Sequence, residues 1–150
     1  MPEPSPQGFA HDYLAYLLAR ASLQISTSFH AQVRAAGLTV MEWRVLASLS
    51  DGPPLSIKAL ADIILAQQPT VTKLVGRMAQ QGWVTRSSSR ADKRQTLVSL
   101  TDKGQAAAAP LLALAKAHEQ DVLATLGVDD ETRLKSQLRT LIQQSARDRN

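Results

Sequence analysis

The chain has 150 residues, of which 44% are hydrophobic and 20% charged, and its formal net charge is +4 at pH 7; this is typical of one globular domain or of two small ones that share a core. Cysteine is absent, which excludes disulfides and thiolate chemistry. No apolar run approaches the roughly 20 residues that span a bilayer, so we expect a cytoplasmic protein without a membrane partner.

The chain begins with a short leader and then a long helix. Residues 1–8 lack the basic and apolar regions of a signal peptide, and we expect them to be disordered. Residues 9–36 contain neither proline nor glycine, and apolar residues recur there at helical spacing. A second stripe that includes Tyr13 and Tyr16 lies on another face. A helix with two apolar faces usually packs against more than its own domain.

The middle of the chain predicts a winged helix-turn-helix. A helix over residues 39–50 and the turn Asp51–Pro54 precede a second helix, which Ser56 can cap. A third helix begins near Gln68 or Pro69. Two alternating segments, 83–87 and 96–100, then pair as a hairpin around a loop.

Two further helices complete the predicted fold. Thr101 can cap the first, in which we expect Pro110 to cause a kink or a delayed start, and Asp129 or Asp130 can cap the second. The fold class is therefore mainly α, with a winged helix-turn-helix over residues 38–101 and a two-stranded β-hairpin as its wing.

The positive charge is concentrated in this winged segment. Residues 56–104 carry eight Lys or Arg against three Asp, whereas the rest of the chain has a net charge of −1. Such an uneven distribution is typical of a surface that binds nucleic-acid phosphates. We therefore expect double-stranded DNA as the partner.

The third helix has one apolar and one polar face. Val71, Leu74, Val75 and Met78 share an arc, and Lys73 and Arg77 lie on the opposite side. Arginine can bind a guanine edge, and either residue can hold a phosphate; the alternative is an ordinary solvated face. The predicted DNA contacts of this helix are Gln68, Pro69, Thr70, Thr72, Lys73 and Arg77.

The hairpin loop supplies the second set of cations. Charges on a tight loop can enter the minor groove, although many hairpin tips are charged only for solubility. We expect Arg94 to insert there or to grip the backbone, with Asp92 holding its guanidinium in an ion pair. The predicted wing residues are Arg86, Arg90, Asp92, Lys93 and Arg94.

Two sequence blocks resemble the MarR family of bacterial transcription regulators. They are TVTKLVGRMAQQGWVTR at Thr70–Arg86 and DKRQTLVSLTDKG at Asp92–Gly104, and the second resembles the family's wing signature. The resemblance covers nearly the whole chain. Two residues depart from it: Pro69 stands where a serine is common, and Gly76 stands where a larger polar residue is usual.

The resemblance implies a homodimer held by the terminal helices, here residues 9–36 and 102–147. It also implies a repressor that leaves a pseudo-palindromic operator when a small aromatic or phenolic effector binds. The polar and aromatic residues that could line an effector pocket are Tyr13, Tyr16, Arg20, Trp43, Arg44 and His118. The alternative interpretation of each of these residues is an ordinary core, surface or interface residue.

Two other classes of function have weaker support in the sequence. The winged helix can instead bind an acidic protein without recognising a DNA sequence. An enzyme is disfavoured because the sequence shows no nucleophile–base pair, carboxylate constellation or phosphate loop. The three histidines form no paired motif, so we expect neither a metal nor a cofactor.

Overall fold

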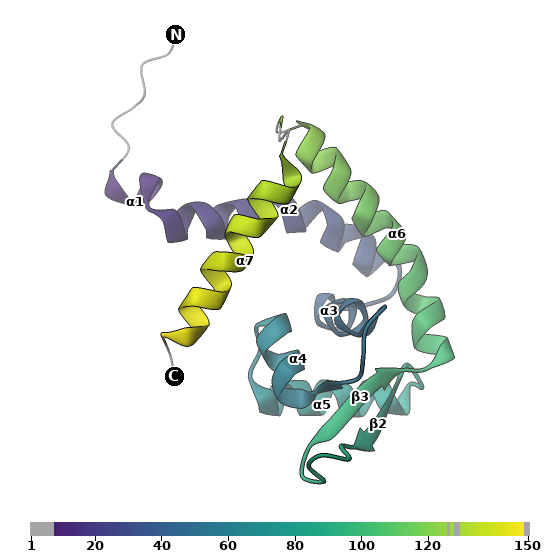
Figure 1. Ribbon diagram of the computed structural model, residues 1–150. Coiled ribbons are helices and arrows are strands. Elements are labelled where there is room, and N and C mark those ends of the chain that lie inside the picture. The colour runs from purple at the N-terminus through teal and green to yellow at the C-terminus, as the bar shows by residue number, and fades with distance from the viewer. Residues whose placement is uncertain (1–7, 126, 128–129, 149–150) are drawn as a thin grey trace. The chain divides into compact units, whose positions relative to one another are not determined.

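The computed structural model describes residues 8–125, 127 and 130–148, and the chain divides into two compact units after Leu114. Apart from Gly8, the predicted leader lies outside the described residues. The first unit holds all the strands and most of the helices of the described chain (Figure 1). The second unit begins inside the helix α6.

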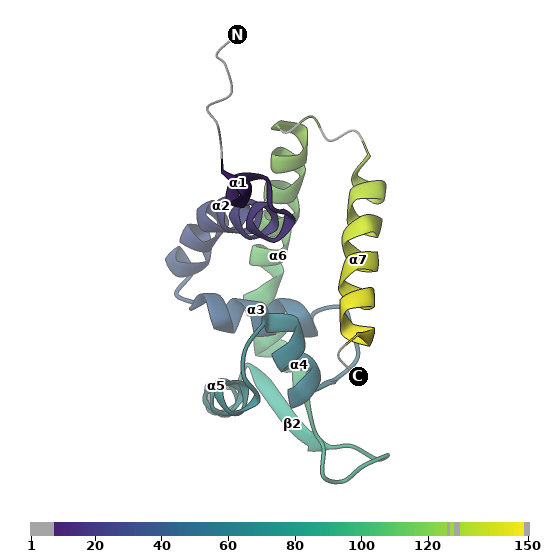
Figure 2. The same ribbon diagram turned by 90° about the vertical axis from the view of Figure 1, so that its left-hand side faces the viewer.

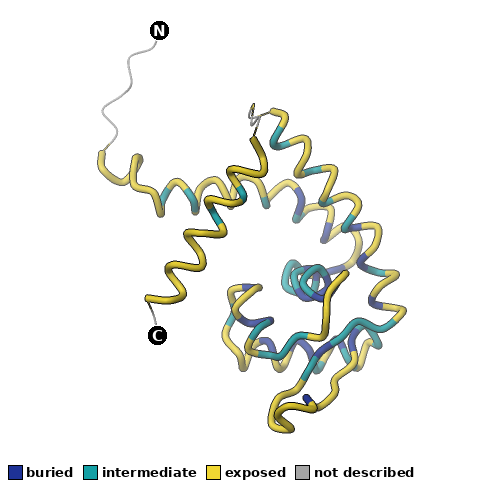
Figure 3. The backbone as a smooth tube through the Cα atoms, in the orientation of Figure 1, coloured by how far each residue is buried: buried dark blue, intermediate teal, exposed yellow. Residues whose placement is uncertain are grey.

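The N-terminal segment forms two helices rather than the single one that we predicted. α1 covers Phe9–Asp12 and α2 covers Leu14–Ala35, with Tyr13 in an extended conformation between them. Only the C-terminal part of α2 joins the core, through Phe29 and Val33. The rest of α2 is largely exposed (Figure 3).

The next two helices begin where the sequence predicts them. Thr39 and Glu42 form a reciprocal capping box at the start of α3, Val40–Leu49. Ser56 accepts a hydrogen bond from the Ala59 amide at the start of α4, Ile57–Ile64. Both helices therefore have local polar signals that fix their first turns.

α5, Gln68–Gln80, begins with Pro69 in its first turn, where the missing N–H costs no helical hydrogen bond. The strands β2, Val84–Ser88, and β3, Thr96–Leu100, form the predicted antiparallel hairpin. A strand that the sequence did not reveal, β1 at Leu55–Ser56, pairs with the other side of β3. The sheet thus has three strands in the order β1-β3-β2.

The core of the first unit lies where α3, α4 and α5 meet the sheet (Figure 3). The α5 arc is buried as predicted. On α4, helical spacing would place Ile63 on the inner face with Leu60 and Ile64, but Ile63 is 55% exposed and Ala61 is buried instead. The fully buried large side chains are Leu46, Leu60, Ile64, Leu74, Met78, Val33, Val45, Val71, Val75 and Val98.

The last two helices are α6, Asp102–Thr125, and α7, Glu131–Arg147. The α6 helix begins at Asp102, so Pro110 does not delay its start. Asp130 caps α7 by accepting from the Arg133 amide, 2.8 Å away. Within the second unit, Lys135 bridges Glu119 on α6 and Glu131 on α7. None of the described helices is both long and apolar enough to cross a membrane.

Candidate nucleic-acid interface

The outer face of α5 is the first part of the candidate interface. Its inner face packs against α4 and β2, which fixes the direction in which the other face points. That other face exposes Thr70, Lys73, Arg77 and Gln80, as the helical periodicity predicted. A rigidly held helix with cations and small polar groups on its free side is suited to enter a DNA groove.

Contacts with the start of α6 hold the C-terminal end of α5. Lys103 Nζ donates to the Gln81 carbonyl at 2.6 Å, and the Thr101 hydroxyl donates to the Gly82 carbonyl. The same hydroxyl accepts from the Gly104 amide at 3.1 Å, which confirms Thr101 as the cap of α6. The Thr-x-x-Gly end of the second sequence block, Thr101–Gly104, thus fixes the start of α6 to the end of α5.

The register of the hairpin determines where Arg86 lies. Arg86 pairs with Val98, and Val84 pairs with Leu100. Side chains opposite each other in an antiparallel pair share a face, so Arg86 lies on the same face as the buried Val98. Its head extends to α5, where Nη1 is 3.9 Å from the position that a Cβ of residue 76 would occupy.

Arg86 therefore belongs with α5 rather than with the tip of the wing. A hollow of about 560 Å³ opens between them, and we call it the helix hollow. It is lined by Thr70, Lys73, Gly76, Arg77, Gln80 and Arg86.

The loop of the wing has its own hydrogen-bonded structure. Ser89 is buried, and its Oγ accepts from the amides of Ala91 and Asp92 at 3.2 and 3.3 Å. The Ser89 and Gln95 main chains bond across the base of the loop at 3.0 Å. The loop extends beyond the helices of the first unit (Figure 2). It carries Arg90, Lys93 and Arg94, all exposed.

The contact of Asp92 differs from the predicted ion pair. Its Oδ1 accepts from the backbone N–H of Arg94, 3.0 Å away. The structure gives no ion pair within 4.0 Å between Asp92 and the Arg94 guanidinium; the described pairs all involve Lys135. The carboxylate therefore shapes the loop, and the guanidinium stays available to a partner.

A second hollow, of about 350 Å³, opens between the wing and the start of α4. We call it the wing hollow; its lining includes Lys58, Gln68, Thr72, Arg94 and Thr96. Sequence reasoning missed Lys58 and Thr96. Lys58 did carry a signal, because a cation in the first turn of a helix opposes the helix dipole and so suggests another use.

The cations of this surface lack acidic partners. Among the described residues, neither an ion pair nor a side-chain hydrogen bond engages Lys73, Arg77, Arg86, Arg90, Lys93 or the Arg94 side chain. Thr72 is exposed, and its hydroxyl donates to the Gln68 carbonyl at 3.0 Å. The face formed by α5, β2 and the wing loop therefore presents uncompensated positive charge, which favours a polyanion.

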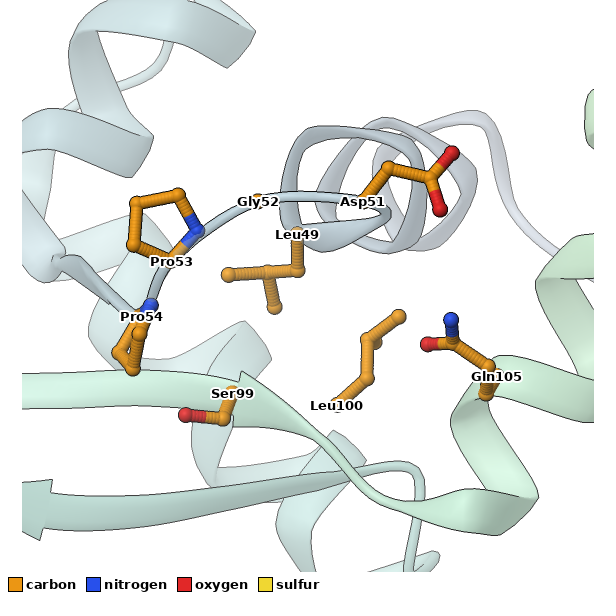
Figure 4. A pocket seen from close by; sticks show the side chains of 8 residues that line it. All are labelled: Leu49, Asp51, Gly52, Pro53, Pro54, Ser99, Leu100 and Gln105. Carbon is orange, nitrogen blue, oxygen red and sulfur yellow. The ribbon is translucent and has the colours of Figure 1, made fainter.

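A third pocket, of about 420 Å³, has a different chemistry (Figure 4). It lies beside the turn after α3, and Leu49 and Leu100 contribute apolar side chains. The Asp51 carboxylate, the Ser99 hydroxyl and the Gln105 amide supply its polar side chains, and none of its lining residues is a cation. This pocket is thus unsuited to phosphate and includes none of the predicted site residues.

Comparison with known proteins agrees with this geometry. Residues 36–95 match the model of the MarR family. A solved MarR family transcriptional regulator from Silicibacter pomeroyi is 44% identical, with 91% of this chain and 98% of that chain covered and a TM-score of 0.80. The chain belongs to the MarR family of transcriptional regulators. The fold class predicted from the sequence is therefore confirmed.

Two further relatives of this MarR-family chain have informative names. The homoprotocatechuate degradative operon repressor of Escherichia coli is 31% identical over 96 residues, with 64% of this chain and 65% of that protein covered. The structure of the transcriptional repressor CouR bound to a 23-mer DNA duplex is 29% identical, with 90% and 96% covered and a TM-score of 0.73.

Five of the six predicted effector residues of this MarR-family chain lie in the first unit, where each has its own local contacts. The Tyr13 ring lies tilted against that of Phe9, with ring centroids 5.2 Å apart, and the Arg20 guanidinium is 6.0 Å from the Tyr16 ring centre. Trp43 is buried edge-to-face on Phe29, and Arg44 Nη1 lies 3.5 Å from the Ile64 carbonyl. His118 belongs to the second unit.

His30, near the C-terminal end of α2, is a further titratable group of the first unit. Burial lowers the pKa of His30 below its usual 6.5, and the positive charges of Arg44 and Arg34 lower it further. The imidazole is thus kept neutral at the pH where an exposed histidine would begin to take up a proton. Sequence reasoning noted His30 only as an isolated histidine.

Proposed function

We propose that this MarR-family chain acts as a homodimeric DNA-binding repressor in the cytoplasm. Each protomer would place α5 in the major groove and the wing loop against the minor groove of a pseudo-palindromic operator. The observation that carries the proposal is the set of cations without acidic partners on the free face of α5 and on the wing. The DNA complex of the related CouR supports the same partner.

The exposed apolar residues support a dimer. Phe9, Leu14 and Leu23 on the N-terminal helices are 81%, 58% and 64% exposed. On α7, Leu141 and Ile142 are 38% and 67% exposed. Large apolar side chains that a helix leaves exposed often mark an interaction site. Residues 9–36 and 102–147 are therefore proposed as the dimerisation region, and residues 38–101 as the DNA-binding part.

A small aromatic or phenolic effector is the proposed signal. The support comes from the 31%-identical relative, whose name assigns it to the homoprotocatechuate operon. An effector lowers operator affinity only if it binds the DNA-free arrangement of the dimer more tightly than the bound one. Tyr13, Tyr16, Arg20, Trp43, Arg44 and His118 remain the residues proposed for this role.

The test is binding to genomic fragments selected by the purified chain. We expect a salt-sensitive complex in which the logarithm of the affinity falls linearly with the logarithm of the salt concentration. The selected sites should contain two half-sites about 10 base pairs apart, because two recognition helices must enter successive major grooves about 34 Å apart.

The protein-contact alternative predicts a different result. A winged helix that binds an acidic protein would form no sequence-selective complex with any fragment, even at low ionic strength. Competition with unlabelled random DNA separates the two outcomes, because an operator complex survives an excess of random duplex. Loss of the complex under that competition would contradict the repressor proposal.

A further inference from the structure

The helix hollow brings together three cations from two elements. Lys73 and Arg77 lie one helical turn apart on α5, and Arg86 reaches the same hollow from β2. The hollow contains no acidic side chain, and its other lining residues are Thr70, Gly76 and Gln80. Three like charges around one space repel each other, and an anion in that space would reduce this repulsion.

The shape of this cluster indicates a phosphate rather than a base edge. One arginine satisfies the two acceptors of a guanine edge, and a guanine carries no charge to offset three cations. A phosphate has a negative charge and several acceptor lone pairs, which can take hydrogen bonds from more than one guanidinium. Thr70 and Gln80 add neutral donors at the rim of the hollow.

Gly76 keeps the hollow open. The Arg86 guanidinium nitrogen is 3.9 Å from the place of a Cβ at residue 76, which is an ordinary contact distance for that one atom. Any longer side chain would extend into the space that the guanidinium and an anion need. The glycine at this position therefore allows Arg86 to lie over the helix.

We propose that Lys73, Arg77 and Arg86 form one phosphate-binding site across α5 and β2, and that Gly76 determines its access. This inference rests on the proposed DNA-binding function and assigns Arg86 to the helix rather than to the wing tip. The site takes a single phosphate group per protomer. Arg77 then contributes affinity rather than sequence discrimination.

A double-mutant cycle tests the role of Gly76. Affinity for a selected operator is measured by fluorescence anisotropy for wild type, G76Q, R86Q and the G76Q/R86Q double variant. We expect R86Q and G76Q each to weaken binding by about tenfold per bound protomer, because each removes a charged contact. The double variant should bind the operator at most about twofold more weakly than R86Q does, because both changes remove the same contact.

G76A is the matched control, because its Cβ meets Arg86 at 3.9 Å and goes no further. We expect G76A to lose less affinity than G76Q, because it adds one carbon instead of a long side chain, and circular dichroism confirms that each variant folds. If the affinity losses of G76Q and R86Q multiply in the double variant, the two residues act independently and the proposal is wrong. Tighter binding by G76Q would also overturn it.

The salt dependence tests whether one phosphate is shared. In a shared site, each single variant leaves the phosphate bound by the remaining cations and changes the salt slope little, and the R77Q/R86Q double variant lowers the slope by at most about one per protomer. Two separate phosphate contacts would instead lower it by about two, which contradicts the proposal. Operators with single base-pair changes should lose affinity equally for wild type and R77Q; a selective loss of discrimination in R77Q would contradict it as well.

Measuring DNA affinity in chloride buffer and in phosphate buffer identifies the source of the phosphate group. Replacing chloride with inorganic phosphate at constant ionic strength weakens DNA binding by wild type but not by R86Q if free phosphate enters the site. Equal affinities for wild type in both buffers assign the site to a DNA backbone phosphate. A wild-type chain that binds no DNA would refute the proposed function itself. A wild-type chain that binds DNA, with affinity losses of G76Q and R86Q that multiply in the double variant, would refute only this phosphate site.

Discussion

At the scale of the residue, two glycines inside helices have opposite surroundings. An ideal Cβ at Gly104 would lie 2.0 Å from the Trp83 carbonyl oxygen, a separation that real Cβ atoms do not show. A Cβ at Gly76 would meet only Arg86, at 3.9 Å. Gly104 is therefore required by close packing between α6 and Trp83, in the segment between α5 and β2, whereas Gly76 leaves room for one carbon.

This contrast predicts opposite effects on stability. We expect Gly104→Ala to lower the free energy of unfolding by about 1–3 kcal/mol, because the backbone must shift to admit the methyl group. Gly76→Ala should raise it by up to about 1 kcal/mol, because alanine favours a helix. Thermal unfolding followed by circular dichroism measures both. Equal stability of the two variants would show that α6 does not pack so closely on Trp83.

A second residue-scale prediction concerns His30. Its pKa is lower in the folded chain than the 6.5 of an exposed histidine. The unfolded chain therefore binds a proton more readily, and the folded state loses stability as the pH falls through about 6.5. The contribution is fully present above that pH.

We expect His30→Gln to reduce the fall of the unfolding temperature between pH 7.5 and pH 5.5 by about 1–3 °C. His11→Gln is the matched control, because His11 is exposed on α1. Differential scanning calorimetry at the two pH values measures the difference. An identical fall in wild type and His30→Gln would contradict the lowered pKa that burial and the charges of Arg44 and Arg34 give His30.

At the scale of the element, the wing loop is an ordered structure built by its own short side chains. Ser89 and Asp92 each accept hydrogen bonds from backbone amides within the loop. These bonds fix the path of the segment that carries Arg94. Because a loop that is ordered before binding loses less entropy when it contacts DNA, these bonds should increase affinity.

Two substitutions of Asp92 separate loop shape from ion pairing. Asp92→Ala removes the acceptor for the Arg94 amide, and we expect DNA affinity to fall about three- to tenfold. Asp92→Asn removes the same charge but keeps an acceptor oxygen, so its affinity should equal or exceed that of wild type. Fluorescence anisotropy compares the two. If Asp92→Asn binds as weakly as Asp92→Ala, the negative charge itself is needed.

The elements that the sequence predicted well have local signals. The apolar arc of α5 follows the helical period, and Thr39, Ser56 and Thr101 cap helices through bonds to nearby amides. β1 has only two residues, too few for a periodic pattern. Its existence depends on β3, a partner more than 40 positions away in the chain.

The parts of the site that the sequence did not predict depend on tertiary register. Arg86 reaches α5 because it pairs with Val98, and no local pattern fixes that pairing. Lys58 and Arg94 line the same wing hollow because the fold places the start of α4 beside the wing. Residue types on one helix could be inferred from the sequence, whereas groups shared between elements needed the fold.

At the scale of the whole molecule, the exposed apolar side chains have to be explained together with the cations. Leu17 on α2 is 44% exposed, and Ile142 on α7 is 67% exposed, although neither belongs to the basic surface. A second copy of the chain would cover such residues. It would also supply the second recognition helix that a two-part operator requires.

Two aspartate substitutions, one of an exposed apolar residue on α2 and one on α4, test the proposed dimer. We expect Leu17→Asp to convert two-chain particles into single chains, because a charge buried at an interface is costly. Ile63→Asp is the matched control: Ile63 is 55% exposed, but it lies on α4 within the proposed DNA-binding part. Light scattering after size-exclusion chromatography measures the mass of each variant.

The same pair of variants links assembly to DNA binding. A single chain can contact only one half-site, so Leu17→Asp should lose most of its affinity for the full operator and little of its affinity for an isolated half-site. Ile63→Asp should stay a dimer, so its preference for the full operator over the half-site should be retained. If Leu17→Asp remains a dimer with normal operator affinity, α2 does not hold the two copies together, and the exposed residues of α7 become the surface to vary next.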